Sequence, residues 1–288
     1  MSDEVAHRMC EICGNRTARL PLRGGGSLTQ CLDCGHLTRD LAAAPAAHRD
    51  HAYGGEPTLD VWRLALTHRL LTKGGTPPRS VFEVGYGSGA LLRRFLNDGA
   101  RAAGTDPDQL EVDVDPVVRE RAELYDVPIE QLAATVDPVQ LVYGIHVLEH
   151  VLDPMRTLRH SADLLAPGGV VQFLTPAGDS DGLRAYGGAW WMLEDPTHVR
   201  FFSAESLRRA AASVGLVDVR VTRPALDSLV TDVASLARLT RPRKRPHGVL
   251  AQRSVLAAGL ASAPVVLAAR ALRPTLRPTL HLTARRPG

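Results

Sequence analysis

Four cysteines stand close to the start of the sequence, in a spacing that suits a metal ion. They form two Cys-x-x-Cys pairs, Cys10 with Cys13 and Cys31 with Cys34, and seventeen residues separate the pairs. A tetrahedral zinc ion takes four thiolates in this arrangement. Because the protein would supply all four ligands, the sequence predicts a closed, structural Zn²⁺ site. The alternative is four unligated thiols.

A second cluster consists of glycines in the stretch VFEVGYGSG. Gly85, Gly87 and Gly89 alternate after an apolar run that contains Glu83. Glycines let the backbone turn sharply and approach a ligand closely, and a helix start beyond them would offer free N–H groups. The spacing is G-x-G-x-G rather than the dinucleotide fingerprint G-x-G-x-x-G. Asp106 ends the next apolar run and could bind both hydroxyls of a ribose; the alternative is a tight turn with a surface aspartate.

Three histidines are candidates for a general base, because an imidazole has an ordinary pKa of about 6.5. They are His146 and His150 in the stretch HVLEH, and His198. His150 is favoured, since it lies beyond the carboxyl end of a predicted parallel strand, where α/β sheets bind ligands. Glu149 would orient His150 or contact the substrate. Alternatively, the Glu–His pair caps a helix start and His198 packs inside a loop.

The elements that must position these residues alternate between two types. Apolar runs typical of strands occupy residues 80–85, 101–106, 139–145, 170–176, 216–223 and 280–288. Patterns typical of helices occupy residues 57–75, 90–99, 153–169 and 203–215. Alternation of this kind predicts βαβ units and a mainly parallel sheet.

Several of these motifs together resemble class I methyltransferases that use S-adenosylmethionine. The similar stretches are EVGYGSG, TDPD, HVLEHVLDP, LAPGGVVQFLTP and DPTHVRFFSAESLRRAAASVGL. The resemblance implies an α/β, Rossmann-like sheet of seven strands with an antiparallel last strand. It also implies that Glu83 and the three glycines bind the amino-acid part of S-adenosyl-L-methionine, and that Asp106 binds its ribose. His146 is included among the cofactor-binding residues.

The zinc ribbon followed by this domain is similar to bacterial C-methyltransferases that act on nucleotide-linked deoxysugars. That resemblance implies a small-molecule substrate, such as a nucleotide-linked sugar or another natural-product intermediate. The alternative is an RNA methyltransferase that grips nucleic acid with its ribbon. The sequence has HVLEH where base N-methyltransferases commonly carry Asn/Asp-Pro-Pro-aromatic, and its ribbon lacks aromatic residues for base stacking. No nucleic-acid partner is therefore expected.

The predicted organisation has five segments. They are a zinc ribbon (1–40), a helical connector (41–78), a methyltransferase core (79–225), a helical insertion (226–278) and the last strand of the core (279–288). The formal charge of +3 is too small to argue for nucleic acid by itself. No apolar run follows Met1, so no signal peptide is expected and the predicted location is the cytoplasm.

The helical insertion combines charge with an apolar stretch. RPRKRPHG at 241–248 carries four cationic side chains, and VLAAGLASAPVVLAA at 255–269 follows it. Fifteen apolar residues broken by Pro264 are too few to cross about 30 Å of hydrocarbon. A basic segment beside an apolar helix suits an anionic membrane surface. The sequence therefore leaves two readings open: peripheral contact with the inner membrane surface through 241–273, or a helical lid or dimer interface.

Overall fold

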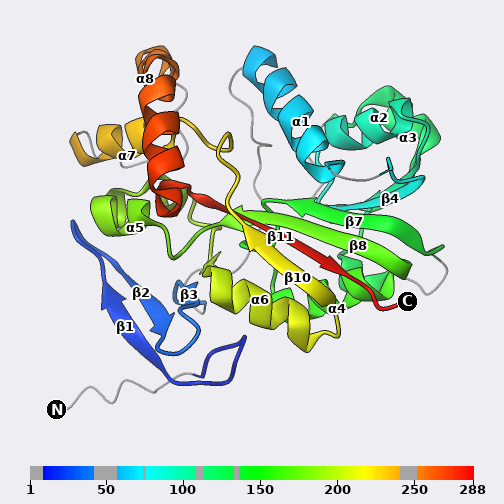
Figure 1. The fold of residues 1–288 in the computed structure, drawn as a ribbon, viewed down its shortest axis with the longest axis horizontal. Coiled ribbons are helices and arrows are strands. Elements are labelled where there is room, and N and C mark those ends of the chain that lie inside the picture. Colours follow the sequence, from blue (N-terminus) through cyan, green and yellow to red (C-terminus); the bar gives the residue numbers. More distant parts are fainter. Residues whose placement is uncertain (1–8, 42–56, 74–75, 108–112, 133–135, 241–251) are drawn as a thin grey trace. The chain divides into compact units, whose positions relative to one another are not determined.

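The computed structural model describes residues 9–41, 57–73, 76–107, 113–132, 136–240 and 252–288 (Figure 1). The chain forms two compact units, each built from segments that are far apart in sequence. The sheet unit comprises Ala47–Thr175, Ala211–Val221 and His281–Gly288. The ribbon unit comprises Met1–Ala46, Pro176–Ala210 and Thr222–Leu280. Each unit thus combines residues that the sequence-based boundaries assign to different segments.

A seven-stranded mixed sheet forms the centre of the sheet unit. In spatial order its strands are β10 (Val217–Thr222), β11 (Thr279–Arg285), β8 (Leu165–Pro176), β7 (Val139–Ile145), β4 (Ser80–Val84), β5 (Arg101–Thr105) and β6 (Glu123–Tyr125). Strands β8, β7, β4, β5 and β6 pair in parallel.

Strand β11 runs antiparallel to β8. Near one end Gly168 donates to the carbonyl of Arg286, and Arg286 donates back to Gly169. Just beyond the other end of β8, the amide of Ala177 donates to the carbonyl of Pro278. Residue numbers therefore rise along β8 where they fall along β11. The predicted sheet of seven strands with an antiparallel last strand is therefore confirmed.

Helices cover both faces of this sheet. Figure 1 shows α1 (Pro57–Leu71), α2 (Ala90–Asn97) and α3 (Pro116–Arg121) on one side and α4 (Pro154–Asp163) on the other. A short 3₁₀ turn, η2 (Ile129–Gln131), precedes β7. Leu92 and Phe95 of α2 are fully buried in a core cluster with Val81 of β4 and Leu141 of β7. Their spacing places one face of α2 on the sheet, as a 3.6-residue repeat requires.

The prediction of a helix over 153–169 was too long. Asp153 caps α4, accepting from the amides of Met155 and Arg156, and the helix ends at Asp163. β8 already begins at Leu165, and Gly168 has a φ of +73°, a left-handed conformation that glycine adopts without steric cost. The strand β6 and the helix α3 were not predicted.

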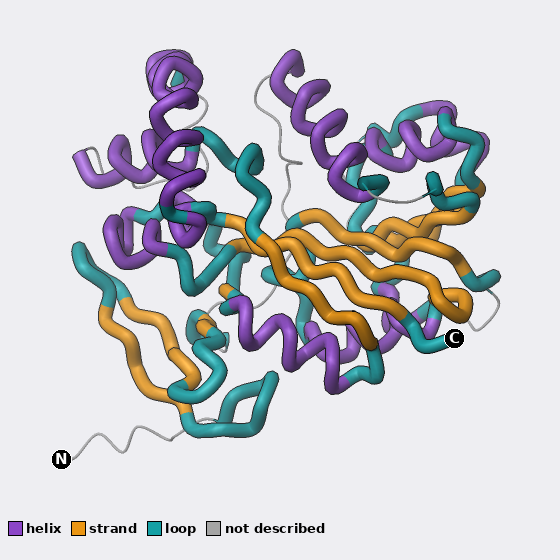
Figure 2. The backbone as a smooth tube through the Cα atoms, in the orientation of Figure 1, coloured by secondary structure: helices purple, strands orange, loops and turns teal. Residues whose placement is uncertain are grey.

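A four-stranded antiparallel sheet forms part of the ribbon unit. Its order is β1 (Thr17–Pro21), β2 (Ser27–Cys31), β3 (Leu37–Thr38) and β9 (Arg200–Phe201), with the β1–β2 hairpin drawn in orange in Figure 2. The other elements here are α5 (Asp181–Tyr186), α7 (Thr231–Thr240), α8 (Arg253–Leu272), η3 (Gly187–Ala189), η4 (Trp191–Leu193) and η5 (Pro274–Leu276), while α6 (Ala204–Ser213) belongs to both units. Leu28, Leu37, Trp190 and Phe201 share one buried cluster.

Charged side chains tie the first strands to the segment around β9. Glu11 accepts from Nε and Nη2 of Arg200 at 2.8 and 3.0 Å, and its Oε1 lies 2.9 Å from His36 Nε2. Burial alone would raise the pKa of Glu11, but the bonds to His36 and Arg200 outweigh it and lower the pKa to about 2. Arg39 donates to the carbonyls of Leu193 and His198. The cysteine region is therefore joined to residues 193–201 by strand pairing, by the Glu11–Arg200 ion pair and by the hydrogen bonds of Arg39.

Candidate active site and metal centre

The glycine loop between β4 and α2 has three glycines in left-handed backbone, with φ of +73° at Gly85, +51° at Gly87 and +74° at Gly89. A Cβ on Gly85 would lie 2.7 Å from Val147 Cγ2, and one on Gly89 would lie 2.8 Å from Val118 Cγ1. Close packing therefore excludes a side chain at Gly85 and at Gly89. A Cβ on Gly87 would meet no heavy atom within 4 Å. The middle glycine thus borders open space that a ligand could fill.

Two acidic residues flank this loop. The amide of Gly87 donates to Asp106 Oδ2 at 2.7 Å, which ties the end of β5 to the loop. Tyr143 donates to Glu83 Oε2 at 3.0 Å. Burial raises the pKa of Glu83 well above its usual range, the Tyr143 bond opposes this, and the charge of Asp106 adds to it. A cationic group beside Glu83 would favour its ionised form.

A histidine–glutamate pair lies just after β7. Nδ1 of His146 is 2.9 Å from Glu149 Oε1, and Thr175 donates to Glu149 Oε2 at 3.0 Å. Glu149 has no exposed surface. Its burial would raise its pKa, but the bond to His146 and the charges of His146 and His150 lower the pKa overall. This shift favours the ionised form of Glu149, and an ionised carboxylate accepts a hydrogen bond from the Nδ1–H of an imidazole.

The structure bears on both sequence-based interpretations of HVLEH. Glu149 hydrogen-bonds His146, and a ligand atom of its carboxylate lies within 4.8 Å of one of His150; the sequence suggested that Glu149 would orient His150 or contact the substrate. The helix-cap alternative is wrong, because Asp153 caps α4 and the side chain of Glu149 bonds to other side chains. His150 is buried, and its amide donates to the carbonyl of Val147 at 2.9 Å. His146 has a φ of +57°, a strained conformation for a non-glycine residue.

His198 belongs to the ribbon unit, where it is fully buried. Its Nδ1 lies 2.8 Å from the carbonyl oxygen of Met192, and its Nε2 lies 3.6 Å from Asp195 Oδ2. These contacts within one loop agree with the packing role that the sequence left open for His198. The structure brings Glu83, Gly87 and Asp106 together, and it also brings Glu149 close to His146 and His150.

The four cysteines converge, as their spacing predicts. The Sγ atoms of Cys10 and Cys34 are 3.7 Å apart, those of Cys13 and Cys31 are 3.5 Å apart, and all four lie within 4.8 Å of one another. A tetrahedral ion with Zn–S bonds of about 2.3 Å needs sulfurs about 3.8 Å apart. None of the four forms a disulfide. The cluster is therefore compatible with a zinc ribbon.

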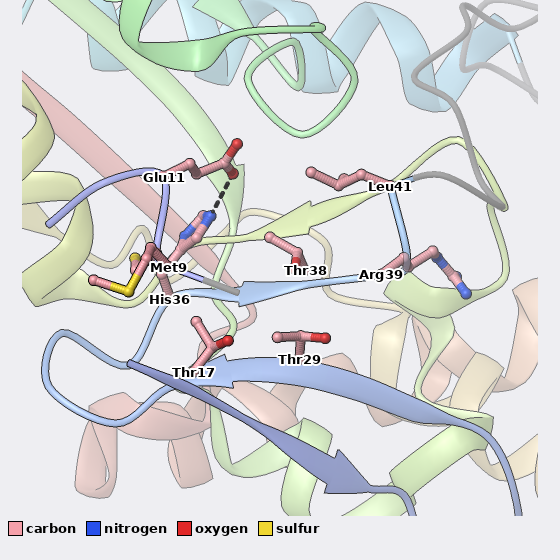
Figure 3. Close-up of a pocket in the computed structure, with 9 residues that line it drawn as sticks. Met9, Glu11, Thr17, Thr29, His36, Thr38, Arg39 and Leu41 are labelled. Carbon is pink, nitrogen blue, oxygen red and sulfur yellow. Dashed lines mark hydrogen bonds and ion pairs between the residues drawn. The ribbon is translucent and has the colours of Figure 1, made fainter. Parts of the chain in front are cut away.

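A small hollow lies beside the cysteine cluster (Figure 3). Its volume is about 70 Å³, and its lining includes Glu11, Thr17, His36 and Thr38. The hydrogen bond between Glu11 and His36, dashed in Figure 3, lies in this lining. Pockets for drug-sized molecules measure about 300–1,000 Å³. This hollow is therefore far too small for S-adenosylmethionine.

We expect one zinc per chain in freshly purified protein and almost none in Cys31→Ser, because a structural site needs all four thiolates. The substitution should also raise hydrogen exchange around β9, since β3 pairs with β9. Metal analysis and exchange mass spectrometry measure the two effects. Met9→Ser, beside Cys10 and 64% exposed, is the control and should keep its zinc. Wild-type protein purified with only a trace of zinc would refute the site.

Comparison with known proteins agrees with the sheet unit's architecture. The phosphoethanolamine N-methyltransferase 2 of Haemonchus contortus, solved with S-adenosylmethionine, superimposes with a TM-score of 0.52 over 79% of this chain and 53% of that chain. At 14% identity, this likeness shows the fold alone.

Two curated relatives are nearer in sequence. A tRNA U34 carboxymethyltransferase of Klebsiella pneumoniae is 31% identical over 186 residues, covering 62% of this chain and 52% of the relative. A ubiquinone biosynthesis O-methyltransferase of Alkalilimnicola ehrlichii is 30% identical over 131 residues, covering 42% of this chain and 51% of the relative. The chain thus spans about half the length of the curated relatives it matches.

A family model described as a methyltransferase domain matches residues 57–221, which is more than half of the chain. The match begins at α1 and ends in β10, so it contains the glycine loop, Asp106 and the His146–Glu149 pair. The chain therefore belongs to this methyltransferase family.

Proposed function

We propose that this methyltransferase acts on a small-molecule acceptor, a nucleotide-linked sugar or another natural-product intermediate, and that His146 removes the acceptor's proton. The observation that supports the base is the buried carboxyl group of Glu149, whose Oε1 lies 2.9 Å from Nδ1 of His146. When Nδ1 carries the hydrogen that Glu149 accepts, Nε2 is the unprotonated nitrogen of the neutral imidazole. An imidazolium formed there would be stabilised by the adjacent carboxylate.

The cofactor would be held by the residues around the glycine loop. Glu83 would bind its amino group, the open space at Gly87 would admit its amino-acid part, and Asp106 would bind its ribose. When bound, S-adenosylmethionine supplies an electrophilic methyl group on sulfur. The protein then has to orient the acceptor and accept its proton, and positioning of this kind contributes much of the rate.

Thr175 and Glu149 serve as positioning residues in this proposal. Thr175 donates to one oxygen of Glu149, which leaves the other oxygen for His146. His146 itself has a left-handed backbone, with a φ of +57°. Strain of this kind often marks functional positions. His150 and His198 remain the alternative bases.

An RNA substrate is the second candidate, because several curated relatives are tRNA U34 carboxymethyltransferases. The cysteine region does not support it. Residues 1–46 contain five Arg and five Asp or Glu, and no Phe, Trp or Tyr. Single-stranded nucleic acid is usually bound by a positive groove with aromatic stacking platforms. The small-molecule reading therefore has the better support from this chain's own residues.

Methyl-labelled cofactor distinguishes the two substrates. We expect the purified enzyme to transfer label into a low-molecular-weight metabolite extract of the source cells and not into bulk tRNA. Acid precipitation separates RNA from small molecules, and chromatography follows the labelled product. A Gly87→Val sample sets the background. Label that accumulates in the acid-precipitated RNA, and disappears with ribonuclease, would establish the RNA substrate instead.

A further inference from the structure

Helix α8 in the ribbon unit has an apolar surface on the side that faces solvent. It is 20 residues long, and no charged residue lies between Arg253 and Arg270. Its most apolar window has a mean hydropathy of 1.8, and only 17% of that window is buried. A surface helix of a globular protein normally presents polar residues to water. Helix α8 therefore lacks the polar face that is typical of a solvent-exposed helix.

One side of α8 is fixed by packing within its unit. α8 packs on α7, and Gly259 lies so close to the preceding segment that a Cβ there would be 2.7 Å from Val230 Cγ1. Arg270, only 1% exposed, donates to the carbonyls of Asp227 and Ser228. Figure 1 shows the two helices, with α8 in orange-red. Because these contacts fix one side of α8, the opposite side of the helix is the one left exposed to solvent.

The opposite side is continuous and apolar. Between Val255 and Arg270, the exposed residues are Ala257, Ala258, Leu260, Ala261, Pro264, Val265 and Ala268. Leu272 continues this face at 89% exposure, and Val265 is 73% exposed. At 1.5 Å per residue, the face from Ala257 to Leu272 extends over about 22 Å. By length and composition α8 could also cross a membrane, but its packed side and the buried Arg270 argue against a span.

The charge of this part of the chain is strongly one-sided. No Asp or Glu follows Asp232, whereas eleven Arg and Lys do, in a chain whose formal net charge is only +3. Arg253 is exposed at the start of α8. Arg273 follows its end with a side chain 65% exposed, and it also donates to Asp181. A surface with cationic residues around an apolar helix face attracts a partner that is both anionic and apolar.

We infer that α8 is a peripheral membrane-binding element whose exposed apolar face enters the headgroup region of an anionic lipid bilayer. Arg253 and Arg273, at the two ends of the helix, would lie at the level of the lipid phosphates. A nucleic acid would satisfy the charge but leave the apolar face in water. A second copy of the chain would cover the apolar face but repel the cationic ends. An anionic lipid surface satisfies both features.

Vesicle flotation of the full-length protein tests this assignment. We expect binding to phosphatidylglycerol vesicles, much weaker binding to phosphatidylcholine vesicles, and weaker binding at high salt. Val265→Glu should reduce binding to phosphatidylglycerol by about tenfold or more, because it places a carboxylate in the contact face. Val61→Glu is the matched control, since Val61 is a 59% exposed valine on α1. It should bind as the wild type does.

Each of the other outcomes would overturn the inference. Equal vesicle binding by Val265→Glu and by the wild type would show that α8 does not contact the membrane. Equal binding to phosphatidylglycerol and phosphatidylcholine vesicles would show that the protein does not prefer anionic lipid. A dimer that Val265→Glu dissociates, in protein that does not bind vesicles, would assign the face to a second copy. Both variants should bind S-adenosylhomocysteine as the wild type does, so a failure here is distinguishable from loss of the methyltransferase function.

Discussion

Gly87→Val should lose all calorimetrically detectable binding of S-adenosylhomocysteine while the sheet unit stays folded. A Cβ on Gly87 meets no heavy atom of the described chain within 4 Å, so the first atom of the new side chain would lie in open space. It would instead occupy the space that the open loop offers to the cofactor. The neighbouring glycines could not test this, because Cβ atoms there would clash with Val147 and Val118.

The matched control is Gly99→Val. Gly99 follows α2 in the same unit, has a φ of +84°, and a Cβ there also meets nothing within 4 Å. Both variants carry the strain of a left-handed residue, about 1–2 kcal/mol, so their thermal unfolding should shift by similar amounts. Only Gly87→Val should lose ligand binding. If calorimetry gives the same affinity for both, the glycine loop is not where the cofactor binds.

His146→Ala should lower the turnover rate by about 10²- to 10⁴-fold, because a positioned general base contributes that much. Cofactor affinity should change little, and the limb of the pH–rate profile that reports imidazole protonation should disappear. Glu149→Gln should cause a smaller loss and alter the same limb, since Glu149 acts only through the imidazole at 2.9 Å. Steady-state kinetics across pH, with calorimetry for cofactor affinity, measure these effects.

Three other histidine variants complete this experiment. His160→Ala on α4 is the matched control within the sheet unit and should keep normal turnover. Near-normal turnover in His146→Ala, together with a large loss in His150→Ala or His198→Ala, would move the base to that residue. A fall in cofactor affinity that accounts for the whole loss would instead make His146 a cofactor-binding residue.

The sheet was predictable because its strands are apolar runs separated by glycines and helix signals. The strand β6 was missed because Glu123–Tyr125 is a three-residue run without full burial. The link between His146 and Glu149 could not be predicted, since it depends on a left-handed residue and a turn rather than a helix. The sequence HVLEH places Glu149 near both His146 and His150, and it does not show which histidine Glu149 hydrogen-bonds.

The connection between the cysteine region and the later chain was also invisible in sequence. β9 has only two residues, and Glu11 and Arg200 are 189 residues apart. Neither feature leaves a pattern in the local sequence, because the two partners stabilise each other only after the chain has folded and brought them together. The cysteine spacing, in contrast, is local and predicted the convergence of all four sulfurs.

The pairing of β3 with β9 has a consequence for how the protein is made. Arg39, beside β3, and His198, beside β9, are 159 residues apart, so at 5–20 residues per second a ribosome needs about 8–30 s to bridge them. During that interval the edge of β3 lacks the strand that covers it in the finished protein, and uncovered edges promote aggregation. A nascent chain that captures its metal early would hold the hairpin in register until β9 emerges. The availability of zinc during translation should therefore govern the yield of soluble enzyme more than its activity once folded.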